Sequence, residues 1–215
     1  NESAFYLACK NGCLKAAKWL LEVKPTINIS ANSEEAFRYA CSNGHLKVAQ
    51  WLLEIKPTIN ISAENEYALR WTCNNGHLDI TQWLLKIKPD IDISVYNEQV
   101  FRCACSNGHL KVAQLLLEIK PNINISAENE YAFRWACNNG HIEIAKWLIS
   151  VKPTINISEK NDEAFRITCN NGHLELIKWL LHIKPNIDIS VYNEFAFRYA
   201  CSNGHLKVAQ WLLSI

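Results

Sequence analysis

Residues 129–160 read NEYAFRWACNNGHIEIAKWLISVKPTINISEK, a stretch that predicts two helices followed by an extended arm. Asn129 is a favourable N-cap, and apolar residues follow it at helical spacing, which predicts the first helix. Gly140 ends that helix, since glycine readily takes the left-handed conformation of a helix terminator. A second apolar-periodic run continues until Pro153, because proline cannot extend a helix. The alternation Ile-Asn-Ile then predicts the extended arm.

The same pattern recurs along the chain with a step of 32 residues. Every glycine and every proline falls on this step: Gly12, Gly44, Gly76, Gly108, Gly140, Gly172 and Gly204, with Pro25, Pro57, Pro89, Pro121, Pro153 and Pro185. The 215 residues therefore form six full copies and a shorter seventh, which we expect at residues 1–32, 33–64, 65–96, 97–128, 129–160, 161–192 and 193–215. Periods of this length predict a solenoid in which each repeat contacts only its neighbours.

Composition and charge exclude several classes of protein. The chain is 49% hydrophobic and 20% charged, which is enough apolar material for a core and argues against disorder. Its apolar runs are too short for a transmembrane helix or a signal peptide, so we expect no membrane partner. A net charge of +1 gives no reason to expect binding to nucleic acid or anionic lipid.

The cysteines and histidines do not predict a metal or catalytic site. Each copy offers a Cys-x-x-x-His pair, as in Cys41 and His45, whereas zinc needs four ligands. Repeated identical active sites without an orienting third residue are implausible, and no glycine-rich phosphate loop is present, so we expect neither catalysis nor a cofactor. The histidine is expected to bond nearby backbone. Unpaired thiols indicate a reducing compartment, the cytoplasm or nucleus, which for a viral protein would be that of a host cell.

The copy resembles the ankyrin repeat, a unit of about 33 residues with the same order of elements. Three features carry the resemblance, namely the Gly-His pair after the first helix, a small pair inside it and paired leucines in the second helix: Gly44-His45, Ala40-Cys41 and Leu52-Leu53. The resemblance covers the whole chain, and the run NGHLKVAQWLLE is similar to ankyrin arrays of giant DNA viruses and some protists. It implies an all-α, ankyrin-type solenoid of seven stacked helix-turn-helix repeats joined by extended, hairpin-like loops.

The chain also departs from the ankyrin pattern. The family's Thr-Pro-Leu-His is replaced by residues such as those at 35–38, a Lys-Pro pair replaces the glycine after the second helix, and each copy is one residue short. These differences leave the geometry of the loops and the curvature of the solenoid open. A helical repeat with another stacking geometry is the alternative fold.

Comparison of the copies separates a predicted core from a variable surface. The third, seventh and tenth positions of the first helix vary and share one face, which we call the first-helix stripe; in the fifth copy it is Tyr131, Trp135 and Asn138. In ankyrin arrays, first helices and loop tips line the concave face that usually binds partners. The resemblance therefore implies a protein or peptide partner there, and the alternative is that seventh-position residues pack between repeats. The candidate partner-binding residues are Tyr39, Tyr67, Trp71, Tyr96, Gln99, Tyr131, Trp135, Glu163, Tyr192, Phe195 and Tyr199.

All arginines occupy one position of the copy, four residues after an acid, as Arg38 follows Glu34. This spacing predicts an ion pair on each first helix rather than a ladder for phosphates, because the acids cancel the positive field.

The sequence thus predicts a non-catalytic module for protein–protein interaction. The alternative is a structural or self-assembling array that stacks end to end, because neither terminal copy has the polar outer face of a capping repeat. We expect the 215 residues to be a segment of a longer array.

Overall fold

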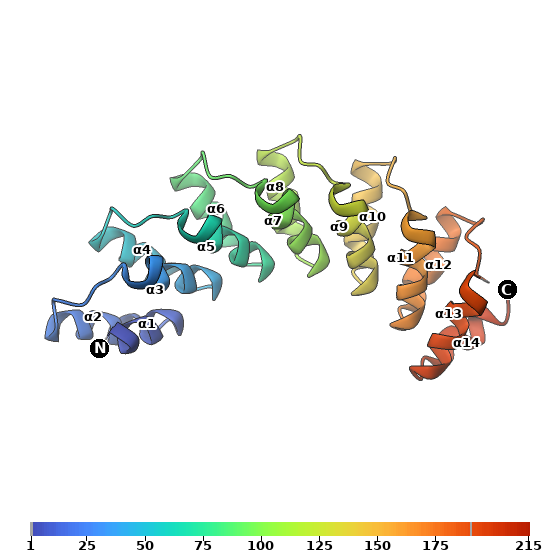
Figure 1. The fold of residues 1–215 in the computed structure, drawn as a ribbon, viewed down its shortest axis with the longest axis horizontal. Coiled ribbons are helices and arrows are strands. Elements are labelled where there is room, and N and C mark those ends of the chain that lie inside the picture. Colours follow the sequence, from blue (N-terminus) through green and yellow to red (C-terminus); the bar gives the residue numbers. More distant parts are fainter. Residues whose placement is uncertain (1, 190) are drawn as a thin grey trace. The chain divides into compact units, whose positions relative to one another are not determined.

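The computed structural model describes residues 2–189 and 191–215, apart from the side chains of residues 191–193. Within these residues the fold contains fourteen helices and no strand, which confirms the predicted all-α class (Figure 1). The helices are α1 (Glu2–Lys10), α2 (Leu14–Val23), α3 (Ala31–Ser42), α4 (Leu46–Ile55), α5 (Ala63–Asn74), α6 (Leu78–Ile87), α7 (Val95–Ser106), α8 (Leu110–Ile119), α9 (Ala127–Asn138), α10 (Ile142–Val151), α11 (Glu159–Asn170), α12 (Leu174–Ile183), α13 (Val191–Ser202) and α14 (Leu206–Leu212).

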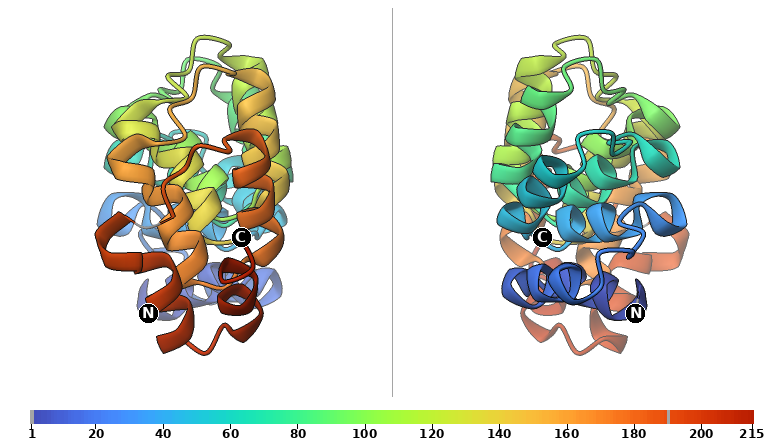
Figure 2. Two further views of the ribbon diagram at one scale, coloured as in Figure 1. Left: turned by 90° about the vertical axis from the view of Figure 1, so that its right-hand side faces the viewer. Right: turned by 90° about the vertical axis from the view of Figure 1, so that its left-hand side faces the viewer.

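The chain divides into two compact units. Unit 1 contains residues 1–104 and 111–122, and unit 2 contains residues 105–110 and 123–215. In unit 1, the first helices α1, α3 and α5 pack side by side, and each also packs against its own second helix. Unit 2 repeats this arrangement with α9, α11 and α13, and the end-on views show each copy as two helices joined by a loop (Figure 2).

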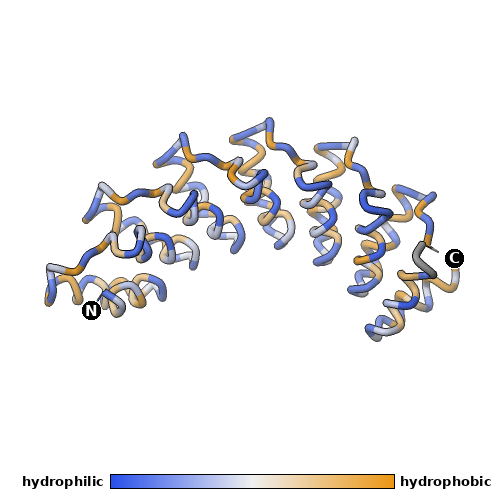
Figure 3. The backbone as a smooth tube through the Cα atoms, in the orientation of Figure 1, coloured by the Kyte–Doolittle hydropathy of each residue, from blue (hydrophilic) through white to orange (hydrophobic). Residues whose placement is uncertain are grey.

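The amphipathic helices bury one face each against neighbouring copies. Apolar and polar residues alternate in colour along the coloured helices in Figure 3, as the helical periodicity predicts. Phe37 and Phe133 of the first helices are fully buried, together with Leu52 and Leu148 of the second helices. Burying a side chain of this size contributes about 1.5–3 kcal/mol, so the repeated apolar positions hold the copies together.

The tight turn between the two helices follows the prediction. Gly140 has a φ of 77°, and its N–H donates to the carbonyl oxygen of Cys137 at 3.2 Å. The ring of His173, from the next copy, packs directly on this glycine, and a Cβ added there would lie 2.7 Å from ring atoms. Glycine is therefore needed both for its backbone conformation and for the close approach of the ring.

The start of the first helix differs from the prediction. In the fifth copy Glu128, Asn129 and Glu130 have φ values of 55°, 56° and 58°, a left-handed turn that precedes the right-handed helix. Asn129 is therefore not a simple N-cap, because its backbone lies within the left-handed turn. The second to sixth copies each contain this turn, although none of its residues is glycine, which normally takes this conformation.

The arginines stabilise the left-handed turns. The predicted ion pair within the first helix is therefore wrong for Arg38 and Arg134. Arg134 donates from Nε to the carbonyl oxygen of Asn129 at 2.7 Å and from Nη2 to that of Glu128 at 3.1 Å. Oε1 of Glu130 instead accepts the backbone N–H of Asn156, in the arm, at 3.2 Å. Arg38 bonds to its own turn in the same way, at 2.7 and 2.9 Å.

The arms consist of turns and irregular chain and contain no strand in the part of the chain that the structure describes, so their extended conformation stays a prediction. Ile155 anchors its arm by burying its side chain, and the equivalent isoleucines of the other arms are buried to the same degree. The Asn156 carboxamide oxygen accepts the N–H of Ser158 at 3.2 Å, which turns the chain into the next first helix. The arms thus set where each left-handed turn begins.

Candidate partner-binding stripe

The third positions of the first-helix stripe contact the arginine of the preceding copy. Nη1 of Arg70 donates to Oε1 of Gln99 at 3.3 Å, and Arg134 forms an ion pair with Glu163. Where the third position is aromatic, the arginine lies over the ring instead: the Cζ atom of Arg38 is 4.7 Å from the centre of the Tyr67 ring. These third-position side chains are half-buried, so much of their surface serves contacts between copies.

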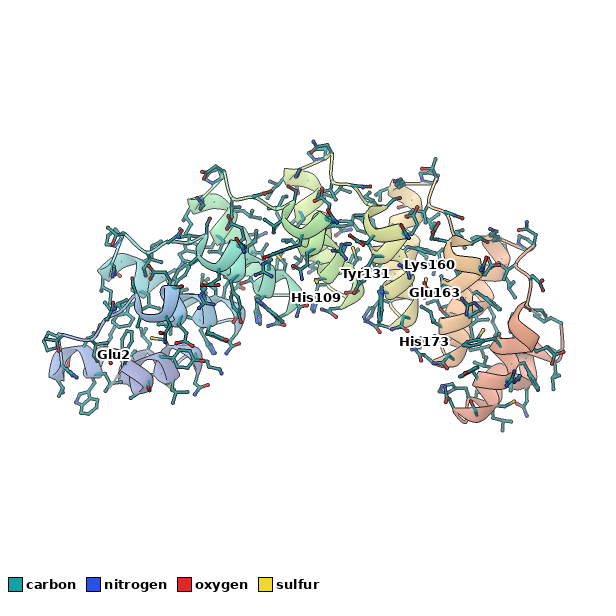
Figure 4. The ribbon with its side chains drawn as sticks, viewed as in Figure 1. Glu2, His109, Tyr131, Lys160, Glu163 and His173 are labelled. Atoms are coloured by element: carbon teal, nitrogen blue, oxygen red, sulfur yellow. The ribbon has the colours of Figure 1, made fainter. Side chains whose placement is uncertain are left out.

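Phe195, another third-position residue, follows the same rule. Its ring centre lies 5.2 Å from the Cζ atom of Arg166. Tyr131 is half-buried on α9, beside the α11 helix that carries Glu163, and Figure 4 labels both residues.

Unit 1 contains a continuous series of aromatic and cationic side chains along the stripe. The rings of Tyr6 and Tyr39 lie 5.5 Å apart, and those of Tyr39 and Tyr67 are also 5.5 Å apart. The Nζ atom of Lys10 lies 5.1 Å from the Tyr39 ring centre, so Lys10 is a further cation beside these rings. Burial is the main cause that raises the pKa of Tyr67 to about 12, and its contact with Tyr39 is the second, so the Tyr67 hydroxyl stays protonated. Tyr39, which lies against the rings of Tyr6 and Tyr67, is itself half-buried.

Three aromatic residues at the seventh position are exposed, whereas Tyr39, Cys103 and Ile167 at the same position are half-buried. Trp71 is 41% exposed, Trp135 39% and Tyr199 41%. Each lies against the third-position ring of its own helix, four residues earlier. The ring centres are 5.9 Å apart with tilted planes for Trp71, and the rings are stacked at 5.5 Å for Trp135 and at 4.0 Å for Tyr199. One face of each exposed ring is thus supported by protein while the other is open to solvent.

One arm tip adds an aromatic residue to this surface. Tyr96 is 54% exposed, and its hydroxyl accepts a hydrogen bond from Nδ2 of Asn65 at 2.9 Å. Its ring centre lies 5.0 Å from the Cζ atom of Arg70, so the tip is fixed rather than free. The predicted site residue Tyr192 lies outside the side chains that the structure describes.

The turn edge of the stripe is a polar ladder between copies. In unit 2, Asn171 donates to the carbonyl oxygen of Asn138 at 2.8 Å, and Nε2 of His173 lies 3.0 Å from the same oxygen. The histidine therefore bonds backbone, as predicted, but backbone of the preceding copy. Burial is the main cause that lowers the pKa of His141 below its ordinary value, and the charges of His109 and His173 lower it further. Figure 4 labels both of these histidines.

Most cysteines of the first helices are buried in the core, whereas Cys103 is half-buried and Cys201 is exposed. Burial raises the pKa of the Cys9, Cys73 and Cys169 thiols to about 12, and it raises that of Cys41 and Cys137 as well. Metal ligation and nucleophilic attack both require a thiolate. These groups therefore act as compact apolar side chains.

Sequence comparison missed the role of the arginine column. The signal was present, because the arginine recurs in the second to seventh copies while the third position, its neighbour across the junction, alternates there between aromatic and polar residues. Which residue pairs with it could not be seen, since Arg134 and Glu163 are 29 residues apart in sequence.

Comparison with known proteins identifies the family. The family model of ankyrin repeats, in three copies, matches residues 1–65, 58–129 and 133–215. The chain therefore belongs to the ankyrin repeat family, whose fold is generally a protein–protein interaction scaffold and is typically non-catalytic.

Among solved structures, the chain is similar to the crystal structure of the human ASB11 ankyrin repeat domain. The TM-score is 0.68 at 18% sequence identity, and the match covers 96% of each chain, so it shows a shared fold. No curated protein matches the chain. Among the described residues, no helix has the length and apolar character needed to cross a bilayer.

Proposed function

We propose that this chain binds a protein or peptide partner along the first-helix stripe and takes no part in catalysis. The observation that carries the proposal is the set of exposed seventh-position aromatics, above all Trp71 and Trp135, on first helices whose core phenylalanines, such as Phe37 and Phe133, are fully buried. Tryptophan and tyrosine supply large contact area with a polar tip and dominate many protein interfaces.

The supports of these rings favour binding. Trp135 stacks on Tyr131, with an angle of 27° between the ring planes. The Tyr67 ring beside Trp71 lies 4.7 Å from the Cζ atom of Arg38, and this arginine is held by two carbonyl oxygens. A surface whose side chains are already fixed loses little conformational entropy when a partner arrives. The remaining candidates, Tyr39, Tyr96, Gln99, Glu163, Phe195 and Tyr199, would then form the margin of the same contact.

End-to-end stacking is the second candidate, and exposed apolar side chains on the terminal copies support it. Leu213 and Ile215 are exposed, and a cavity of about 200 Å³ lies beside Phe197. One detail disfavours it. Gly204 has open space where the other described glycines receive a histidine ring, but the first copy carries Cys13 at the histidine position. If a second copy of this chain stacked on the last copy, its Cys13 could not supply the histidine ring that packs on the glycine at the other junctions.

The thiols support a reducing compartment. None of the nine cysteines forms a disulfide in the structure, and disulfides form readily only in oxidising compartments. We therefore place the protein in the cytoplasm or nucleus as part of the same proposal.

The test compares three forms of the chain: wild type, the double variant Trp71→Ala/Trp135→Ala, and Trp19→Ala. Trp19 is a matched control because it is 58% exposed but lies on α2, away from the stripe. Proteins captured from extract are identified for each form, and the affinity of a purified candidate is then measured. Binding lost only in the double variant supports the proposal, whereas equal binding by all three forms refutes it. Light scattering over a dilution series checks for self-association.

A further inference from the structure

A small hollow in unit 1 lies on the first-helix stripe between α5 and α7. It has a volume of about 30 Å³ and is lined by Arg70, Trp71, Asn74, Gln99 and Cys103. We propose that this hollow binds the carboxylate of an aspartate or glutamate side chain of the protein partner. The inference deepens the proposed function and rests on it for the identity of the ligand's carrier.

Arg70 brings a positive charge that the protein itself leaves unpaired with any acid. Its Nε donates to the carbonyl oxygen of Asn65 at 2.7 Å, and its Nη2 donates to that of Glu64 at 3.0 Å. Both acceptors are neutral, and Arg70 forms no ion pair within the described residues. The side chain of Glu64 is exposed and forms none with it. The guanidinium is therefore held in place while keeping its full charge.

The donors around the hollow suit an anion. A guanidinium carries five N–H groups, and three nitrogens of Arg70 each use one of them in a hydrogen bond, so two N–H groups remain. Because Oε1 of Gln99 accepts from Arg70, the amide nitrogen of Gln99 is left to donate elsewhere. No acidic side chain lines the hollow. Its volume holds about two water-sized groups, which is the size of the two oxygens of a carboxylate.

The electrostatic surroundings point the same way. Burial raises the pKa of the Cys103 thiol, whereas the charges of Arg102 and Arg70 lower it, which places two cations near the wall of the hollow. Trp71 also lines the hollow and is exposed, so an incoming side chain has apolar surface beside the charge.

The equivalent place in unit 2 shows what this arginine position binds. Sixty-four residues further along, the same framework consists of Arg134, Trp135, Asn138, Glu163 and Ile167. Arg134 is anchored on two carbonyl oxygens in the same way as Arg70. Its Nη1, however, pairs with the carboxylate of Glu163, which stands where unit 1 has Gln99. In unit 2 the protein supplies the carboxylate, and in unit 1 the partner supplies it.

This comparison provides matched variants that leave the arginine anchors intact. Gln99→Glu introduces into unit 1 the residue that unit 2 already carries, and Glu163→Gln does the reverse. Both should fold, because each side chain exists at this position in the same protein, and circular dichroism checks this. Substitution of Arg70 is avoided, since it would release the left-handed turn as well.

The probes are N-acetyl-glutamate amide, N-acetyl-glutamine amide and inorganic phosphate, titrated at constant ionic strength because salt screens exposed charges. The readout is the indole ¹⁵N–¹H resonance of Trp71 and that of Trp135. We expect a saturable shift at Trp71 that needs about fivefold less of the glutamate probe than of the glutamine probe. The shift should vanish in Gln99→Glu, and a new one should arise at Trp135 in Glu163→Gln.

Three results would overturn the proposal: equal response to the glutamate and glutamine probes, an unchanged Trp71 response in Gln99→Glu, or a stronger response to phosphate than to glutamate. Absence of any new response at Trp135 in Glu163→Gln would also contradict it. The titration uses no protein partner, so its outcome is independent of the capture experiment above. A responsive hollow without a captured partner would refute the proposed function alone.

Discussion

A glycine placed in the left-handed turn should stabilise the protein, although glycine normally weakens a helix. Glu64 has φ 55° and ψ 48° and an exposed side chain. A residue other than glycine costs about 1–2 kcal/mol in this conformation, because its Cβ approaches the following carbonyl. Glycine removes that cost but adds about 0.4–1 kcal/mol of unfolded-state entropy. The net gain for Glu64→Gly is therefore on the order of 0.5–1 kcal/mol.

Glu64→Gly leaves in place the hydrogen bond between Arg70 and the backbone of residue 64. The group of Glu64 that Arg70 binds is the backbone carbonyl oxygen, which glycine retains. The control is Gln50→Gly, at an exposed position inside the right-handed helix α4. Glycine there should cost about 1 kcal/mol.

Thermal unfolding followed by circular dichroism measures both variants against wild type. We expect the melting temperature to rise by about 1–4 °C for Glu64→Gly and to fall by a similar amount for Gln50→Gly. Opposite signs for the same residue type identify the left-handed turn. A fall for both variants would refute it and would mean that residue 64 has right-handed geometry in solution.

Three further predictions concern the core, the arginine column and the histidine ladder. Phe133→Ala should cost about 3–5 kcal/mol in urea unfolding, because the ring is fully buried. Arg38→Lys should cost about 1–3 kcal/mol in the same assay, since lysine cannot reproduce the two bonds of the guanidinium to the turn, and an unchanged midpoint would contradict this. Because the pKa of His141 is lowered in the folded state, the unfolded chain takes up the proton first. Stability should be full above the ordinary pKa of 6.5 and should fall as the pH falls below it, and His141→Gln should weaken this dependence in urea titrations at pH 7.5 and 5.5.

The sequence alone predicted the elements that depend on local residue types. Gly140 marks the turn because its φ is positive, and Phe133 marks the core because apolar residues recur at helical spacing. Repetition strengthened both, since every copy must bury the same face to stack. These features need no knowledge of which residues meet across copies.

The left-handed turn and the arginine contacts could not be predicted in this way. Asn129 lies in a run without glycine, so its residue types indicate an ordinary N-cap, and only the arginine five residues later supports the unusual backbone. Arg134 stands four residues after Glu130, which suggests a local ion pair, but packing against α11 brings Glu163 closer. In the first case a side-chain contact with the backbone outweighed residue type, and in the second a contact across the junction outweighed local spacing.

The division of the first-helix stripe also required the structure. The sequence treats third and seventh positions alike, because both vary and both lie opposite the core. In the structure the third-position Gln99 meets an arginine of the preceding copy, while the seventh-position Trp71 is left more exposed. The third-position Tyr67 ring packs against Arg38 of the preceding copy and against Trp71 of its own helix.

The most direct test of binding along the first-helix stripe is oxidative footprinting of the tryptophans, with and without a purified partner. Trp71, Trp135 and Trp19 are all substantially exposed in the free chain, so all three should be oxidised. On binding, the account predicts protection of Trp71, Trp135 or both, with Trp19 unchanged. Protection of Trp19 while Trp71 and Trp135 react as before would contradict it and would place the interface on the second helices.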